Sequence, residues 1–449
     1  MKLPRILIAG TASGSGKTTA ASAVLSLLVR RGISAAACKC GPDYIDPTFH
    51  KTVTGLPCTN LDPFFCDENL LKTLLCRENR AQITVIEGVM GYYDGTGADG
   101  AYSTYSVASA TKTPVVLVAD AKGASASLLA TLSGFLDFMP DSRICGVLFN
   151  RAAEMQYQTL ARWTRERFGD RLRPLGFLPV LPPECVIPSR HLGLVTANAI
   201  ADLRVRLEKA ADLCEKTVDL DGLLALANTA PDLEYDLPKL PRFDRIDLAV
   251  ARDDAFCFYY EDTLRLFCEL GAALHFFSPL ANEPLPQNCD GLLLGGGYPE
   301  LYAKKLAANT AAGESIKAAV LAGLPTIAEC GGFQYLGQKL CGEDMCGVLP
   351  HLSENTGKLV RFGYLTLTAK TAGLFGGAGT RLRAHEFHYF DSSENGDGFT
   401  AEKPSGKRWD TCVYTDTLYA GYPHLFLPSN PAAAVEFYKK CLRYKENRA

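Results

Sequence analysis

One cysteine in this sequence stands where a nucleophile would be exposed at a turn. Cys330 follows the apolar run at residues 325–329 and precedes Gly331 and Gly332, in the order Ala-Glu-Cys-Gly-Gly. This pattern predicts a buried strand, a sharp turn and a helix. The partial positive charge at the start of a helix favours a thiolate there. A buried core cysteine is the alternative, and that is our interpretation of most of the other cysteines.

A glycine-rich segment and a histidine supply the other parts of a thiol-dependent site. The segment at residues 294–300, Leu-Gly-Gly-Gly-Tyr-Pro-Glu, ends another predicted strand. Its amide groups, together with that of Gly331, would form an oxyanion hole. His424, in the sequence Tyr-Pro-His, is the candidate base for Cys330. A histidine that packs between turns is the alternative.

Near the amino terminus, the residues have the order expected of a phosphate-binding loop. Residues 10–19, Gly-Thr-Ala-Ser-Gly-Ser-Gly-Lys-Thr-Thr, separate an apolar run from a helical pattern. Backbone amides of such a loop wrap phosphate oxygens, while Lys17 supplies a cation and Thr18 a hydroxyl for Mg²⁺. Thr11 stands where the strict motif has glycine, and an ordinary Gly/Ser turn is the alternative. The expected nucleotide contacts are Gly10, Thr11, Ser13, Gly14, Ser15, Gly16, Lys17, Thr18, Thr19 and, for the base, Asn150.

Acidic residues follow the next two predicted strands. Asp43 and Asp46 lie in Gly-Pro-Asp-Tyr-Ile-Asp-Pro, and Glu87 ends a strand just before a glycine. Parallel sheets hold their ligands at the carboxyl ends of the strands. With Thr18, these three acids would hold Mg²⁺ on the phosphates. For each acid taken alone, a turn residue is the alternative.

Two stretches of the chain, one in each half, alternate short β-branched runs with helical patterns, and these elements must position the candidate site residues. Such alternation predicts parallel sheets that helices cover on both faces. Residues 359–422 then alternate with a period of two, which predicts antiparallel strands, and Ser429 and Asn430 predict the N-cap of a last helix. The expected strands are 6–9, 35–40, 84–87, 115–120 and 144–150 in the first alternation, and 246–252, 273–278, 292–294 and 325–329 in the second.

We therefore predict an α/β protein of two domains, since 449 residues exceed one compact core. Residues 1–195 form a P-loop domain with a mostly parallel sheet, residues 196–244 a helical segment and proline-rich linker, and residues 245–449 the second domain. The 46 Lys+Arg residues against 49 Asp+Glu argue against a generally basic nucleic-acid-binding protein.

The apolar runs are too short to cross a bilayer, and residues 1–10 are predicted as a first strand rather than a signal peptide. The sixteen cysteines are scattered without zinc-ligand spacing. We expect reduced cysteines in a cytoplasmic protein, with no membrane or nucleic-acid partner.

Residues 245–430 resemble class I (triad) glutamine amidotransferase domains, which hydrolyse glutamine to glutamate and ammonia. The resemblance rests on the motifs at residues 295–300, 328–332 and 421–424. It implies a flavodoxin-like α/β fold, with Cys330 and His424 as the catalytic pair. The oxyanion and glutamine-binding residues that it implies are Gly296, Gly297, Gly331 and Gln334.

Two positions depart from the usual amidotransferase pattern. Ala328 stands where most such domains have glycine, and Phe426 stands where most have an acid two residues after the histidine. The form without this acid is characteristic of the cobyrinate/cobyrate synthase branch. It leaves open which group orients His424.

The first half resembles the dethiobiotin-synthetase branch of P-loop proteins, and the whole chain resembles the cobyrinate a,c-diamide synthase family. The segments at residues 39–50, 87–95, 190–194 and 383–389 carry this resemblance. It implies a ligase that uses ATP, Mg²⁺ and glutamine to amidate the a and c acetates of cobyrinate through an acyl phosphate. The alternatives are hydrogenobyrinate or nickel-sirohydrochlorin as acceptor, and a non-enzymatic P-loop scaffold. A homodimer is a further expectation.

A polycarboxylate acceptor requires cations and an aromatic surface. Residues on the predicted strands of the second half would supply the cations. The alternative is that these residues only form the solvent-exposed face of an edge strand. His50 is left undecided. The residues assigned to the acceptor are Tyr44, Arg383, His385 and His388, with Arg361 and Arg381 as further candidates.

Overall fold

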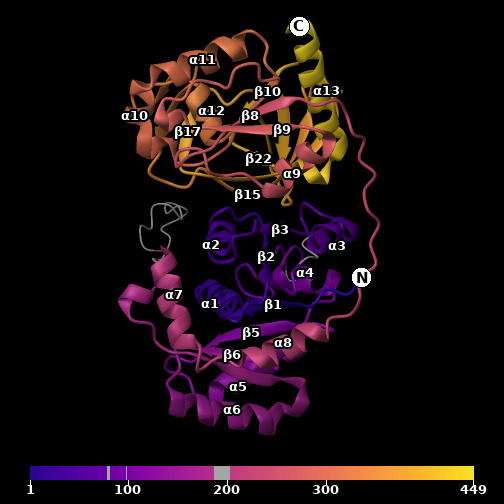
Figure 1. Cartoon of the computed structure of the whole chain (residues 1–449), viewed down its shortest axis with the longest axis vertical. Helices are drawn as coiled ribbons and strands as arrows, with labels where there is room; N and C mark the ends of the chain where they lie inside the picture. Colours follow the sequence, from indigo (N-terminus) through magenta and orange to yellow (C-terminus); the bar gives the residue numbers. More distant parts are fainter. Residues whose placement is uncertain (78–80, 98, 187–202, 449) are drawn as a thin grey trace. The chain divides into compact units, whose positions relative to one another are not determined.

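The computed structural model describes residues 1–77, 81–97, 99–186 and 203–448. The chain divides into two compact units, Met1–Leu237 and Pro238–Ala449, each with its own sheets (Figure 1). The division falls inside the proline-rich segment at residues 231–242. The segment at residues 190–194 that carried part of the resemblance lies outside the described residues.

The first unit is built on a parallel sheet. Its strands are β1 (Arg5–Gly10), β2 (Ala35–Cys40), β3 (Thr59–Leu61), β4 (Ile83–Glu87), β5 (Val115–Asp120), β6 (Ile144–Asn150) and β7 (Arg173–Leu178). They pair in the order β3-β2-β4-β1-β5-β6-β7. The predicted strands of this half are confirmed to within one residue, because each is a short and almost wholly buried apolar run. The strands β3 and β7 were not predicted.

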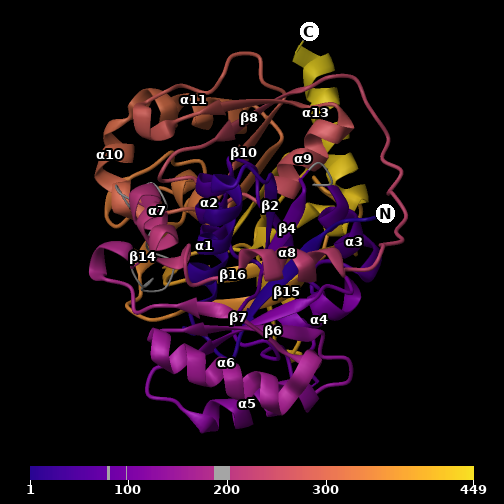
Figure 2. The same cartoon turned by 60° about the horizontal axis from the view of Figure 1, so that its bottom comes forward.

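Helices cover this sheet and carry the residues between its strands. They are α1 (Lys17–Arg30), α2 (Ile45–Thr54), α3 (Glu68–Arg77), α4 (Thr104–Ala110), α5 (Ala126–Asp137), α6 (Glu154–Phe168), α7 (Leu203–Cys214) and α8 (Leu220–Asn228). Helices α1 and α7 lie side by side in both Figure 1 and Figure 2. Leu25 of α1, Ala211 of α7 and Leu223 of α8 share one core with the central strands. The helices of the segment at residues 196–244 therefore close the core of the first unit.

The second unit combines a mostly parallel sheet with two smaller sheets. The main sheet has the order β20-β21-β11-β10-β8-β9, an antiparallel sheet has the order β19-β18-β15-β16-β22, and a third has the order β13-β12-β14-β17. The strands of the main sheet are β8 (Asp247–Ala251), β9 (Ala273–Phe277), β10 (Gly291–Leu294), β11 (Thr326–Glu329), β20 (Val413–Tyr414) and β21 (Leu418–Gly421). The others are β12 (Lys339–Leu340), β13 (Glu343–Asp344), β14 (Leu352–Asn355), β15 (Arg361–Ala369), β16 (Arg381–His388), β17 (Phe390–Ser392), β18 (Phe399–Glu402), β19 (Arg408–Thr411) and β22 (His424–Leu425).

Two cores lie on the two faces of the main sheet. One joins Leu248 and Ile327 to the antiparallel sheet and the last helix, and the other joins Leu292 and Ala328 to the helices of the opposite face. The helices of this unit are α9 (Glu261–Leu270), α10 (Ala303–Ala308), α11 (Thr310–Leu321), α12 (Gly331–Leu336) and α13 (Pro431–Arg448). The predicted N-cap of α13 is confirmed in part, because Asn430 Oδ1 accepts from the Ala433 amide at 3.3 Å.

The sixteen cysteines all lie among the described residues, and each is a free thiol. Most are buried, whereas Cys268 and Cys341 are exposed. Across the described part of the chain, no helix has both the length and the hydropathy that a bilayer crossing requires.

Candidate active sites

Cys330 occupies the sharp turn that the sequence predicts. Strand β11 ends at Glu329, Cys330 has φ 48° and ψ −99°, and α12 begins at Gly331. A residue other than glycine holds such a φ only where its surroundings impose it. Here the Cys330 amide donates to Gly421 O at 2.8 Å, and the Gln334 amide donates to Cys330 O at 2.9 Å. The thiol is thereby held at the end of the main sheet.

The environment of the Cys330 thiol differs from the expectation of a thiolate. Burial, and next the nearby Glu300 carboxyl, raise the pKa of the Cys330 thiol. Only 9% of Cys330 is exposed, and α12 is a helix of six residues. The partial positive charge at the start of so short a helix does not offset the effect of burial on the pKa of the thiol. The resting thiol is therefore protonated, and a base must remove its proton.

His424 lies in position to be this base, because two strand pairings lead to it. Glu329 of β11 pairs with Gly421 of β21, and the chain then turns so that His424 pairs with His385 of β16. His424 is only 4% exposed. A Cβ on Gly296 would lie 2.2 Å from Cε1 of His424, so the imidazole lies directly against the glycine-rich segment.

The two glycine-rich segments meet at the predicted oxyanion site. The Gly332 amide donates to Gly295 O at 3.0 Å. The amide nitrogen of Gly297 is 3.2 Å from the position of a Cβ on Gly331, so the backbones of these two residues approach closely. Gly297 has φ 158°, and a Cβ there would lie 2.1 Å from Ala255 O. The Gly331 amide also makes a hydrogen bond with the Cys330 thiol, and the oxyanion site at Gly297 and Gly331 stays a prediction.

Gln334, the remaining residue assigned to glutamine, is buried on α12. Its side chain makes a hydrogen bond with Tyr422, whose hydroxyl also lies 2.9 Å from Ser392 Oγ. This places Gln334 one turn after Cys330 and against the loop that carries His424.

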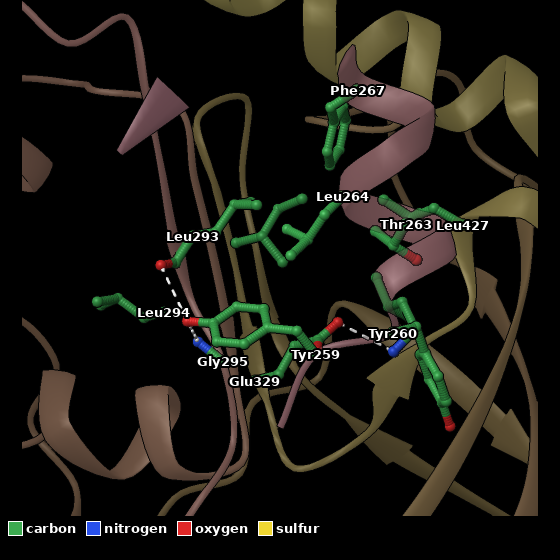
Figure 3. Close-up of a pocket in the computed structure, with 12 residues that line it drawn as sticks. Tyr259, Tyr260, Thr263, Leu264, Phe267, Leu293, Leu294, Gly295, Glu329 and Leu427 are labelled. Atoms are coloured by element: carbon green, nitrogen blue, oxygen red, sulfur yellow. Dashed lines mark hydrogen bonds between the residues drawn. The ribbon is translucent and has the colours of Figure 1, made fainter. Parts of the chain in front are cut away.

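Glu329 is a residue of this site that the sequence interpretation missed. Its Oε1 accepts from the Leu425 amide at 2.9 Å, and its Oε2 lies 3.7 Å from Nδ1 of His424. Figure 3 shows the Glu329 carboxylate in the wall of a small cavity, with Tyr259 and Gly295 close by. The cavity measures about 30 Å³, and its other walls are apolar residues such as Leu264. The available signal was an acid at the end of an otherwise buried strand.

The acceptor residues assigned on β16 do not share one environment. Arg383 is exposed, whereas His385 is buried and its ring lies 5.6 Å from that of Phe362. His388 is buried, and its ring stacks on that of Tyr422 at 3.9 Å. Burial lowers the pKa of His388 to about 4, which disfavours a charged imidazole at this position. The assignment of His388 to the acceptor stays a prediction.

Glu386, next to these histidines, is another buried carboxyl group. It is 0% exposed, neither of its oxygens has a hydrogen-bond partner, and Oε1 lies 3.9 Å from Nε2 of His388. Burial raises the pKa of Glu386 to about 7. Tyr44, the fourth residue assigned to the acceptor, belongs to the first unit, where it precedes α2.

In the first unit, the phosphate-binding loop has the expected backbone. Gly14 and Gly16 have φ of 76° and 97°, which residues with a side chain rarely adopt. A Cβ on Gly10 would lie 2.1 Å from Ser15 Oγ. The Lys17 ammonium folds back onto Ala12 O at 3.1 Å. Burial, and next the positive charge of Lys39, lower the pKa of Lys17 to about 8.

Two of the three acids assigned to Mg²⁺, Asp46 and Glu87, lie in a buried network around Lys39. Thr18 Oγ1 donates to Glu87 Oε1 at 2.6 Å, as expected of a Thr–carboxylate pair beside the phosphates. Lys39 Nζ lies 3.0 Å from Glu87 Oε1 and 2.9 Å from Asp46 Oδ2, and His50 Nε2 lies 2.6 Å from Glu87 Oε2. Although burial acts to raise it, the Lys39 charge and next the His50 contact hold the pKa of Glu87 well below its usual range.

Lys39 and His50 both contact Glu87, which the sequence assigned to Mg²⁺, and neither was itself assigned to this site. The available signal for Lys39 was a lysine inside the otherwise apolar buried strand Ala-Ala-Ala-Cys-Lys-Cys. For His50, the signal was its position on α2, within one turn of Asp46.

Two other residues differ from the roles assigned to them. Asp43 Oδ1 accepts from the Ile45 and Asp46 amides at 2.7 and 3.2 Å, so it caps the start of α2. Asn150 Nδ2 donates to Ser15 O at 2.9 Å. Its side-chain amide therefore supports the phosphate-binding loop, whereas the sequence assigned it to the nucleotide base. Thr18 and Glu87 remain the oxygen donors that fit Mg²⁺, which prefers hard oxygen ligands. Among the described residues, no group of three or more His, Cys, Asp or Glu side chains is arranged to hold a metal ion.

Comparison with known proteins agrees with this pair of sites. Residues 6–190 match the family model of the CobQ/CobB/MinD/ParA nucleotide binding domain, and residues 247–432 match that of the CobB/CobQ-like glutamine amidotransferase domain. A cobyrinate a,c-diamide synthase of Thermoplasma volcanium is 38% identical over 100% of this chain and 99% of its own length. One of Listeria monocytogenes is 39% identical over 95% of this chain and 97% of its own length. Another, of Dehalococcoides mccartyi, is 35% identical over 97% of this chain and 98% of its own length.

Proposed function

Because the chain belongs to the cobyrinate a,c-diamide synthase family, a family of glutamine-hydrolysing amidoligases, we propose that it amidates the a and c acetate carboxylates of cobyrinate. The observation that carries the proposal is the presence of both sites in one chain. The proposal is supported in the second unit by His424 against Gly296 and by Cys330 next to Gly331, whose backbone approaches that of Gly297. In the first unit it is supported by the Thr18–Glu87 hydrogen bond beside Lys17.

In the second unit, we propose that glutamine is hydrolysed through a thioester. His424 takes the proton from the Cys330 thiol as Sγ attacks the carboxamide carbon of glutamine. The amides of Gly297 and Gly331 donate to the oxygen on which negative charge develops. His424 then returns the proton to the leaving nitrogen, and ammonia departs as the C–N bond breaks. Water hydrolyses the thioester, which releases glutamate and restores the thiol.

In the first unit, the proposed chemistry activates a carboxylate. An acetate group of the acceptor attacks the γ-phosphorus of ATP, so an acyl phosphate forms and ADP leaves. Ammonia then attacks the acyl carbon, and phosphate departs with the electrons of the C–O bond. Amidation of two acetate groups consumes two ATP and two glutamine molecules. A carboxylate needs this activation because oxide is too poor a leaving group.

The residues of the first unit have distinct parts in this reaction. Lys17 leaves Ala12 O and neutralises phosphate oxygens, and phosphate contact restores the positive charge that burial disfavours. Thr18 and Glu87 would hold Mg²⁺, which supplies further positive charge to the phosphates when it is bound. The Lys39 charge lowers the pKa of the buried Glu87 carboxyl, and the same ammonium pairs with Asp46.

The identity of the acceptor can be tested by mass spectrometry of the products. The purified protein is incubated with ATP, Mg²⁺ and glutamine and, separately, with cobyrinate, hydrogenobyrinate or nickel-sirohydrochlorin. Two amide additions to cobyrinate, much faster than to the other two, are expected. If hydrogenobyrinate or nickel-sirohydrochlorin were amidated faster, that compound and not cobyrinate would be the substrate. If glutamine were hydrolysed but no ring were amidated, none of the three would be the acceptor.

A further inference from the structure

We propose that Glu329, the residue before the nucleophile, is the carboxylate that orients His424. The inference rests on the proposed glutaminase reaction. Most class I domains place this acid two residues after the histidine, and in this chain that position is Phe426. Phe426 is buried, and its ring packs edge-on against Tyr260 at 5.2 Å. A buried aromatic ring thus fills the position of the usual acid, and a carboxylate approaches the imidazole from β11 instead.

Two contacts fix the Glu329 carboxylate. The strand register pairs Glu329 with Gly421, which brings its side chain to the turn that carries His424. Oε1 accepts from the amide of Leu425, the residue after His424, at 2.9 Å. This backbone bond sets the direction of the carboxylate, and Oε2 is then 3.7 Å from His424 Nδ1. That distance is longer than a hydrogen bond, and catalytic contacts of this kind commonly tighten when substrate binds.

The position of Glu329 selects one state of the imidazole. A carboxylate near Nδ1 favours the tautomer with its proton on Nδ1, which leaves Nε2 able to accept a proton from Cys330. When that proton moves, a thiolate and an imidazolium form together. Glu329 stabilises the imidazolium, because the side chains of Glu329 and His424 are only 13% and 5% exposed and opposite charges interact strongly there. Gly296 bounds the Cε1 edge of the same ring, so the ring is held from two sides.

Other titratable groups flank His424 without taking this position. His385 is its partner across the strands, and His388 lies farther along β16. Glu386 Oε1 lies 3.9 Å from Nε2 of His388, and the charges of Arg361 and Lys403 also act on this carboxyl. Glu300 acts on the Cys330 thiol rather than on the imidazole. The Glu329 contact at Nδ1 is therefore the one that bears on the tautomer.

The variant E329Q removes the charge but keeps an oxygen that can accept from the Leu425 amide. We expect kcat of glutamine hydrolysis to fall by roughly 10²-fold, with KM for glutamine changed by about twofold or less. E329D keeps the charge and should recover part of the loss. E354Q, at an exposed glutamate of β14, is the matched control and should behave as wild type.

A wild-type kcat in E329Q, or a loss of kcat that E329D does not recover in part, would overturn the proposal. A second measurement needs no variant of Glu329. In wild-type protein with ¹⁵N-labelled histidine, and with the His424 signal assigned by its loss in H424N, the proton should reside on Nδ1. A proton on Nε2 would equally overturn it. Both readouts concern glutamine hydrolysis and the imidazole alone. Failure of the proposed ring amidation would instead leave wild-type glutamine hydrolysis intact, so the two failures are distinguishable.

Discussion

The amide of Cys330 donates to the carbonyl of Gly421 at 2.8 Å, so the nucleophile is joined to the strand that leads to its base. Only two residues, Tyr422 and Pro423, separate Gly421 from His424. The strained backbone of Cys330 is held by this bond at one end and by the Gln334 amide at the other. The catalytic pair is therefore positioned by strand pairing rather than by loops alone, which suits a site that must hold reacting atoms within a few tenths of an ångström.

The contact between Gly296 and His424 predicts the effect of adding one methyl group. In G296A the new Cβ would lie 2.2 Å from Cε1, so the ring must move. We expect glutamine hydrolysis to fall by roughly 10²-fold, because a displacement of about 1 Å at a catalytic group costs that much. Ammonia-dependent amidation should be unchanged. G377A, where nothing lies within 4 Å of the new Cβ, is the control. Unimpaired glutamine hydrolysis in G296A would mean that His424 is not held where the reaction needs it.

Lys39 should matter for both folding and synthesis. In K39M, the buried Glu87 and Asp46 carboxylates lose the ammonium between them. Breaking a buried ion pair in this way costs about 3 kcal/mol of unfolding free energy or more. Denaturant unfolding should show this loss, and amidation should fall with glutamine and with ammonia alike, while glutamine hydrolysis persists. K209M, at an exposed lysine of α7, serves for comparison. Wild-type stability in K39M would contradict the network.

Glu386 gives a pH-dependent prediction with a definite sign. Burial raises its folded pKa to about 7, above the value near 4.3 of an unfolded chain. Ionisation therefore costs stability as the pH rises above about 4, and the cost is complete above about 7, where it reaches roughly 3 kcal/mol. E386Q removes this cost. Its melting temperature should exceed that of wild type at pH 8, and the gain should shrink toward pH 4.5. A variant that melts lower at pH 8 would show that the ionised carboxyl is compensated.

The sequence predicts those features that depend on contiguous residues. The order strand, glycine loop and helix at residues 10–19 identifies the phosphate-binding loop, and the order strand, cysteine and two glycines identifies the elbow of Cys330. Buried strands without polar residues are recognised in the same way. Short strands such as β3 are not predicted, because three residues are too few to show a pattern.

Contacts that depend on the register of distant strands could not be predicted. Lys39 faces Glu87 because β2 and β4 pair in one register, 48 residues apart. Glu329 reaches the turn of His424 across 96 residues of chain. Asp43 and Glu87 look alike in sequence, since both are acids after a strand, yet one caps a helix and the other enters the buried network. The pKa shifts of His388 and Cys330 could not be predicted either, because they depend on burial. Burial lowers the pKa of His388 and raises that of the Cys330 thiol.

The central claim is that two separate sites in one chain share the work, and C330A tests it most directly. The variant is incubated with ATP, Mg²⁺ and cobyrinate, once with glutamine and once with an ammonium salt, and the amides on the ring are counted by mass spectrometry. Beside it, K17A is assayed in the same way. We expect C330A to form the diamide from ammonia and none from glutamine, and K17A to form none from either source. Equal amidation by C330A from glutamine and from ammonia would contradict the account, as would retained amidation by K17A.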